Sequence, residues 1–131
     1  MADVGWEAHV AVYSALNTAL SGTATVHDGT APQGQAYPYV TISQQDSVPR
    51  DFLSSYMDER LFTLTVWSTY PGSKEVHTII TTIYGALHQQ KLSMTAGTMV
   101  RAMIERSFNR PDADGETHQG TVIVRVITEH T

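Results

Sequence analysis

The chain has 131 residues, no cysteine and a formal net charge of −5, from 8 Lys and Arg against 13 Asp and Glu. A single domain over residues 1–131 is expected at this length, and the lack of cysteine excludes a thiol nucleophile, a zinc ribbon and a disulfide framework. The acidic balance also argues against a surface that wraps duplex DNA, because phosphate neutralisation requires clustered Lys and Arg.

The N-terminal segment predicts an amphipathic helix and no export signal. Its start, MADVGWEAHV, has neither a basic nor an apolar region, and no apolar run in the chain approaches the ~20 residues of a membrane span. We therefore expect a soluble, unexported protein that binds no membrane. Apolar side chains recur at helical spacing up to a stop near residues 21–22, and they form one stripe: Trp6, Val10, Tyr13, Leu16 and Leu20. Trp6 is expected to anchor this helix on a sheet.

Two strands are predicted next, with a loop between them. Residues 22–38 are rich in Gly, Thr and Pro, which favours an ordered loop that can contain a short strand. Residues 39–45 alternate as a strand does, and residues 59–68 do so more strongly. Between them, residues 46–58 predict a mobile loop, because Pro49 interrupts strand pairing. This loop either folds back over its own core or orders against a neighbouring subunit.

The second half predicts one helix and a hairpin. Val76, Ile79, Ile80, Ile83 and Leu87 fall on helical spacing, so residues 73–89 are expected to form a helix despite their Thr and Ile content. Residues 99–108 and 121–128 alternate as two strands of an antiparallel hairpin. The order of elements predicts an α+β fold, with a mainly antiparallel sheet of about four strands and two main helices packed on one face.

Candidate chemistry is sparse. The longest basic grouping consists of three separated residues, Arg101, Arg106 and Arg110. His77 and His88 share a predicted helix but lie ~16 Å apart along it, which is too far to hold one ion. The turn that carries Asp112 and Asp114 lacks the spacing and the third carboxylate of a calcium loop. No phosphate-binding, nucleophile-elbow or zinc-protease motif occurs, so we expect no metal, no cofactor and no catalysis.

The order of several short motifs resembles a known family. V-H-D-G-x-x-P-Q-G-Q-A-Y-P-Y-V spans residues 26–40, and V-W-S-x-x-P-G spans residues 66–72. A helix that ends in A-L-H at residues 86–88 and P-D-x-D-G-x-x-H-x-G at residues 111–120 follow in order. With the N-terminal helix, this arrangement over nearly the whole chain resembles the small tail completion, or tail terminator, proteins of long-tailed bacteriophages and gene transfer agents.

The resemblance implies a structural protein of the virion tail that is made in the host cytoplasm. Such subunits form a ring, commonly a hexamer, which caps the tail tube, stops its polymerisation and joins the head connector or stopper protein. DNA is expected to pass through the lumen without specific binding, since an acidic channel repels it. Exposure arguments select five candidate partner contacts in the 46–58 loop and at the hairpin tip: Arg50, Phe52, Tyr56, Asp112 and Asp114.

Two other classes of protein stay open. A head-side completion or adaptor protein is also a ring component, and it would bind portal-proximal proteins rather than tail tubes. A small dimeric α+β enzyme or ligand-binding module would need a pocket with convergent polar groups.

Overall fold

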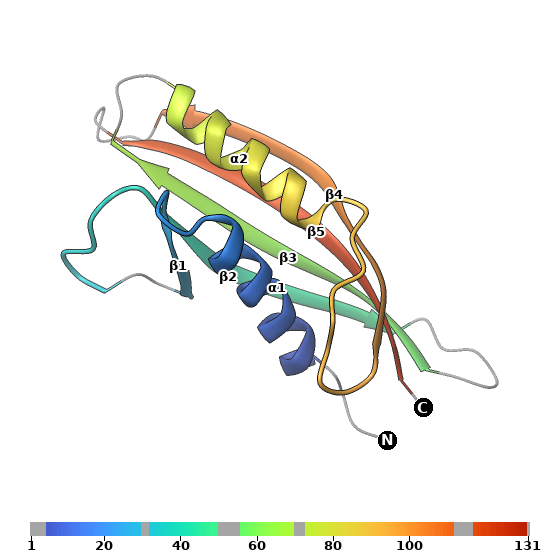
Figure 1. Cartoon of the computed structure of the whole chain (residues 1–131). Helices are drawn as coiled ribbons and strands as arrows, with labels where there is room; N and C mark the ends of the chain where they lie inside the picture. The colour runs from blue at the N-terminus through green and yellow to red at the C-terminus, as the bar shows by residue number, and fades with distance from the viewer. Residues whose placement is uncertain (1–4, 30–31, 50–55, 70–72, 112–116, 131) are drawn as a thin grey trace.

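The computed structural model describes residues 5–29, 32–49, 56–69, 73–111 and 117–130 (Figure 1). It has the predicted α+β fold. The elements are, in chain order, α1 (Gly5–Ala19), β1 (Thr25–Asp28), β2 (Tyr39–Pro49), β3 (Tyr56–Ser68), α2 (Lys74–Leu87), β4 (Thr98–Pro111) and β5 (His118–His130). Neither helix in the described ranges is long and apolar enough to cross a membrane.

The sheet has five strands in the order β1-β2-β3-β5-β4, rather than the predicted four or so. The predicted hairpin of β4 and β5 is confirmed, and β2, β3 and β5 also pair antiparallel. The additional strand is β1, which pairs parallel to β2 with Val26 opposite Val40. Its four residues bury only Val26, so no periodic pattern marked it. Pairing with a strand more than ten residues away decides its structure.

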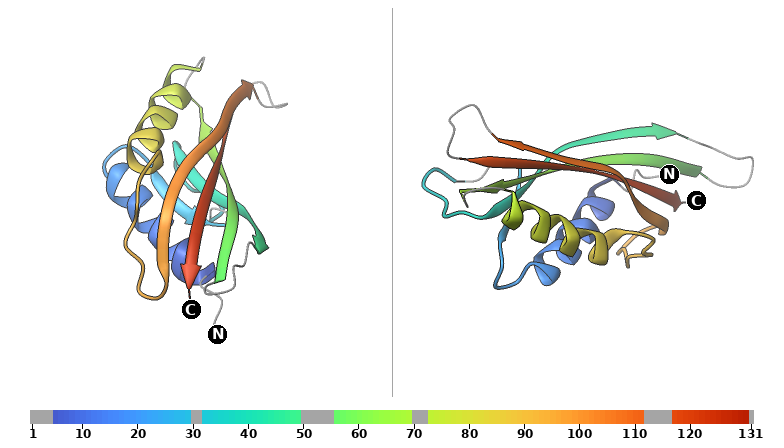
Figure 2. Two further views of the ribbon diagram at one scale, coloured as in Figure 1. Left: turned by 90° about the vertical axis from the view of Figure 1, so that its right-hand side faces the viewer. Right: turned by 90° about the horizontal axis from the view of Figure 1, so that it is seen from above.

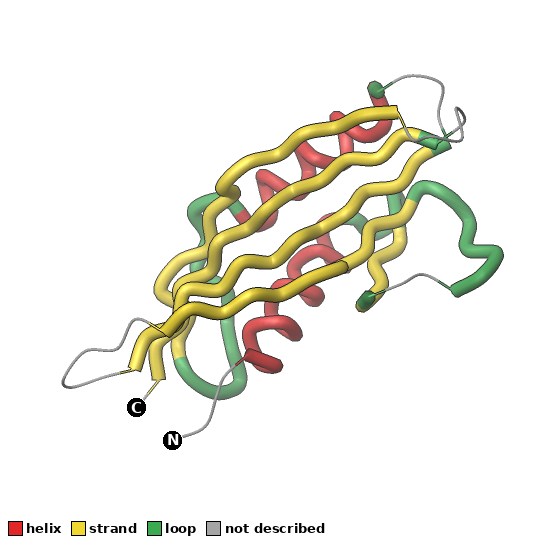
Figure 3. The backbone as a smooth tube through the Cα atoms, turned by 180° about the vertical axis from the view of Figure 1, so that it is seen from behind, coloured by secondary structure: helices red, strands yellow, loops and turns green. Residues whose placement is uncertain are grey.

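Both helices pack on one face of the sheet, as predicted. Figure 2 shows them in a single layer on one side, and Figure 3 shows the strands from the other side. The buried face of α2 uses the predicted positions, including Val76, Ile79 and Ile83. Alternate residues of β3 and β5 meet the helices and are fully buried: Phe62, Leu64, Val66, Val122, Val124 and Val126. This layer between helices and sheet is the hydrophobic core.

The predicted stripe of α1 is wrong in its first half. Trp6 is 66% exposed and Val10 is 38% exposed, whereas the helix buries Ala8, Val12 and Leu16. The spacing of four from Ala8 to Leu16 is as helical as the predicted one. Small residues allow a helix to approach its neighbours closely, so the alanines face inward and Trp6 does not anchor the helix on the sheet.

The strands extend into the segment that was expected to be a loop. β2 continues to Pro49, and β3 begins at Tyr56, so the expected 46–58 loop is shorter at both ends. Pro49 lies opposite Asp58 and does not stop the pairing. β1 pairs with β2 only as far as Ile42, so the end of β2 is an edge strand, where a proline without an N–H is tolerated.

One buried glycine marks a close approach of α2 to the sheet. A Cβ atom added to Gly120 of β5 would lie 2.6 Å from Cγ1 of Val76 and 3.1 Å from Cδ1 of Ile80. Both of those residues are on the buried face of α2. The absence of a side chain at residue 120 therefore sets the spacing between α2 and β5.

Candidate interaction surfaces

A pocket lies between α1 and β1 at one side of the sheet. It has a volume of about 360 Å³ and is lined by Trp6, His9, Val10, Tyr13, Val26, His27 and Asp28. The ring of Trp6 stacks on that of His9, with centroids 5.2 Å apart and planes within 12°. Nε2 of the buried His9 lies 3.5 Å from Oδ1 of Asp28, whose side chain is 60% exposed. The pocket thus combines aromatic walls with a carboxylate at its mouth.

A row of arginines lies at the opposite edge of the sheet. β4 is the last strand in the sheet order, and it exposes Arg101, Arg106 and Arg110. Their partners in β5 are Ile127, Ile123 and Gln119, so all three arginines lie on the face away from the helices. The guanidinium carbon of Arg106 lies 5.0 Å from the ring centre of the exposed Phe108. We call Arg101, Arg106, Phe108 and Arg110 the arginine flank.

The sheet face away from the helices is partly apolar. No described helix covers it (Figure 3). The register places Leu61, Ile123 and Ile127 together on this face, and all three are half-buried. Beside them, Nη1 of Arg125 lies 3.5 Å from Oε1 of Glu59. The face therefore offers a mixed surface of aliphatic and charged side chains.

Aromatic rings gather where β1, β2 and β3 meet. Tyr39 lies 5.1 Å from Tyr37, 6.1 Å from His27 and 6.3 Å from Trp67, measured between ring centroids. Burial raises the pKa of the Tyr39 phenol, and a hydrogen bond with Tyr37 and that residue's charge raise it further. Tyr37 and Tyr39 belong to the motif at residues 26–40, so contacts within the fold account for the two tyrosines of that motif.

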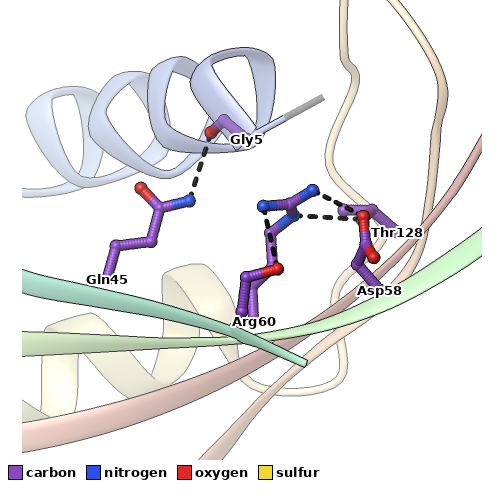
Figure 4. A network of polar contacts seen from close by, with 6 residues as sticks. Gly5, Gln45, Asp58, Arg60 and Thr128 are labelled. Carbon is purple, nitrogen blue, oxygen red and sulfur yellow. Dashed lines mark hydrogen bonds and ion pairs between the residues drawn. The ribbon is translucent and has the colours of Figure 1, made fainter. Parts of the chain in front are cut away.

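A buried polar network joins the ends of three strands, and a separate bond beside it reaches the start of α1 (Figure 4). Nη2 of Arg60 donates to Asp58 at 2.7 Å, Nε donates to Thr128 at 3.2 Å, and Nη1 donates to Ser47 at 3.4 Å. Close by, the side-chain amide of Gln45 donates to the carbonyl oxygen of Gly5. The network fixes β2, β3 and β5 to one another at the end of the sheet where β2 finishes.

His77 on α2 and His88, which follows the last residue of this helix, make structural contacts with β4. Nε2 of His77 lies 3.2 Å from Nδ2 of Asn109, and Nδ1 of His88 accepts the backbone N–H of Ile104 at 3.1 Å. Among the described residues, no group of three or more His, Cys, Asp or Glu is placed to hold a metal ion.

Comparison with known proteins identifies the family. The model of the family described as "Tail completion protein gp17" matches residues 8–129. The chain belongs to this family. This membership confirms the resemblance and makes the chain a structural protein of a virion tail.

A solved structure also has the fold of this tail completion protein. A chain in the virion of a native gene transfer agent particle superimposes with a TM-score of 0.85 at 19% identity, over 98% of this chain and 99% of that one. At this identity the likeness concerns the fold. No curated protein sequence matches the chain.

The five predicted contact residues of this tail completion protein stay predictions. Arg50, Phe52, Asp112 and Asp114 lie outside the described residues. Tyr56 is the first residue of β3, where its backbone is opposite His130.

The structure adds two surfaces that sequence reasoning did not find. Trp6 was assigned to the core, and nothing in the sequence relates His9 to Asp28. The three arginines were noticed, but their spacing of five and four residues does not place them on one face of a regular strand. A β-bulge between Ile104 and Arg106 brings them into line.

Proposed function

We propose that this tail completion protein forms a closed ring, commonly a hexamer, that caps the tail tube and stops its polymerisation. The ring also forms the joint to the head connector or stopper protein, and its role is structural rather than catalytic. Membership of the tail completion family supports this proposal, as does the full-length likeness to a chain of a gene transfer agent particle.

The observation that carries the ring proposal is that the two edges of the sheet present different surfaces. The α1–β1 pocket and the arginine flank lie at opposite ends of the strand order. A ring forms when each subunit uses two different surfaces, one for each neighbour, and the rotation closes. A symmetric dimer would instead use the same surface twice.

The connections between strands support contacts along the ring axis. Residues 50–55 join β2 to β3, and residues 112–117 join β4 to β5. Pro49 lies opposite Asp58 near one end of β3, whereas Ser68, at the other end, is opposite His118. The two connections therefore leave from opposite ends of the sheet. Contacts by Arg50, Phe52 and Tyr56 at one end, and by Asp112 and Asp114 at the other, suit two partners on opposite sides of a ring.

The acidity of the chain suits a conduit for DNA. A net charge of −5 repels phosphates, so DNA passes through the lumen without specific binding.

The test is a mass measurement in solution combined with negative-stain imaging, for the protein alone and with purified tail tubes. We expect six-subunit rings, either free or at the ends of tubes. A monomer or dimer under both conditions would refute the ring. Binding to portal-proximal proteins but not to tubes would assign the chain to the head side instead.

A further inference from the structure

The α1–β1 pocket has aromatic and acidic groups that suit a planar cationic side chain. Trp6 and Tyr13 supply aromatic rings, and the exposed carboxylate of Asp28 lies at the mouth. A guanidinium group binds such a site in two ways, by stacking on aromatic faces and by charge-assisted hydrogen bonds to a carboxylate. Trp6 is already stacked on His9, so little side-chain freedom is lost on binding.

The surface that carries such a side chain is on the same protein. Arg106 is exposed at the centre of the arginine flank and lies beside the ring of Phe108. Neither Arg106 nor its neighbours Arg101 and Arg110 has a carboxylate partner within salt-bridge distance in the described part of the chain. The two surfaces are complementary in charge, and both carry exposed apolar groups, Val10 in the pocket and Phe108 on the flank.

We propose that the α1–β1 pocket of one subunit receives Arg106 from the arginine flank of a second copy of this chain, with Phe108 packed against Val10. This inference rests on the proposed ring and specifies its lateral contact. The guanidinium of Arg106 stacks on Trp6 and pairs with Asp28. Because the pocket and the flank lie at opposite edges of the sheet, the contact repeats head to tail from subunit to subunit.

Charge reversal tests the pairing. Asp28→Arg and Arg106→Glu should each weaken ring formation about tenfold or more per contact, because each places like charges together. An equimolar mixture of the two variants should form rings again. At one contact the introduced glutamate of one variant then meets the introduced arginine of the other, and at the next contact the natural Arg106 meets the natural Asp28. Such alternation closes only in rings with an even number of subunits. Native mass spectrometry should find equal amounts of the two variants in each ring.

The control variant is Lys74→Glu, which makes the same change of charge as Arg106→Glu at an exposed position on α2, away from both surfaces. It should form rings as well as the unmodified protein does. Failure of the mixture to recover, or full assembly of both single variants, would refute the pairing.

Cysteine cross-linking tests the geometry independently, because the natural chain has no cysteine. Val10→Cys and Phe108→Cys chains, mixed with a short bismaleimide, should give a dimer that contains one of each. A chain with both substitutions should give a ladder that ends at the number of subunits in the ring. Dimers of Val10→Cys alone would indicate a symmetric contact and refute the proposal.

The two proposals fail differently. Rings seen by imaging that give no cross-link between residues 10 and 108 would refute this contact and leave the ring intact. Absence of rings with tail tubes present would refute both.

Discussion

The guanidinium of Arg60 lies 2.7 Å from the carboxylate of Asp58, and these side chains are only 2% and 11% exposed. The two residues are on the helix-covered face of β3, where Thr128 and Ser47 accept further hydrogen bonds from the guanidinium. A buried ion pair stabilises a fold little relative to apolar residues, but removing one partner is costly because the other charge stays buried. This pair therefore specifies how the end of the sheet is assembled.

Replacing Asp58 by Asn should lower the free energy of unfolding by about 3 kcal/mol, because the buried guanidinium loses its charged partner. The neighbouring variant Glu59→Gln is the control. It breaks the more exposed Glu59–Arg125 pair, and should cost less than about 1 kcal/mol. Urea denaturation measures both values. Equal costs for the two variants would contradict the special role of the buried pair.

Two glycine substitutions should act in opposite directions. Gly120→Ala should destabilise the protein by about 1–3 kcal/mol, because the new Cβ overlaps with Val76 and pushes α2 from the sheet. Gly85→Ala should stabilise it by roughly 0.5–1 kcal/mol, since residue 85 lies inside α2 with open space around it and alanine favours a helix. Thermal unfolding of both variants decides the matter. A stabilised Gly120→Ala variant would contradict the close approach.

Trp6 and Leu16 should separate assembly from stability. Trp6→Ala should change the free energy of unfolding by less than about 1 kcal/mol, because the side chain is largely exposed. It should nevertheless weaken the assembly into rings. Leu16→Ala should cost about 2–5 kcal/mol of stability, because Leu16 is fully buried. The comparison requires denaturation curves and sedimentation of the same preparations. If the Trp6→Ala variant were strongly destabilised, Trp6 would have to be part of the core.

The predicted contacts at residue 52, between β2 and β3, and at residue 56, where β3 begins, are tested by replacing Phe52 and Tyr56 with Ser. The fold should be retained, as judged by circular dichroism, while binding to tail tubes or to neighbouring subunits weakens. Asp51→Asn in the same connection is a control that keeps both aromatic side chains. Unchanged assembly of the Phe52 and Tyr56 variant would remove these residues from the interface.

The pKa of the Tyr39 phenol should lie above the ordinary value for tyrosine, because burial and the neighbouring Tyr37 raise it. The unfolded chain then loses this proton first as the pH rises. Stability is therefore retained below about pH 10, the ordinary pKa of tyrosine, and falls as the pH rises from there through the folded-state pKa. Ultraviolet titration of the protein and of a Tyr37→Phe variant measures the effect. The variant should titrate closer to the ordinary value.

The spacing of apolar residues in the sequence predicted the helix and strands whose burial follows a regular period. The alternation in β3 and β5, the helical spacing in α2 and the hairpin of β4 and β5 all follow from which side chains avoid water. The order of the motifs at residues 26–40 and 111–120 also indicated the tail completion family, and the family model matches residues 8–129. None of these inferences required knowledge of which elements meet.

Tertiary contacts decided the rest. α1 offered two helical stripes, and packing selected the one with Ala8 and Val12, which left Trp6 exposed. β1 is a strand because β2 lies beside it. The bulge before Arg106 aligns three arginines that a regular strand would divide between two faces. Local sequence patterns are enough to set the period of each element. The rotation and alignment of the elements follow from tertiary packing, because they depend on how distant surfaces fit together.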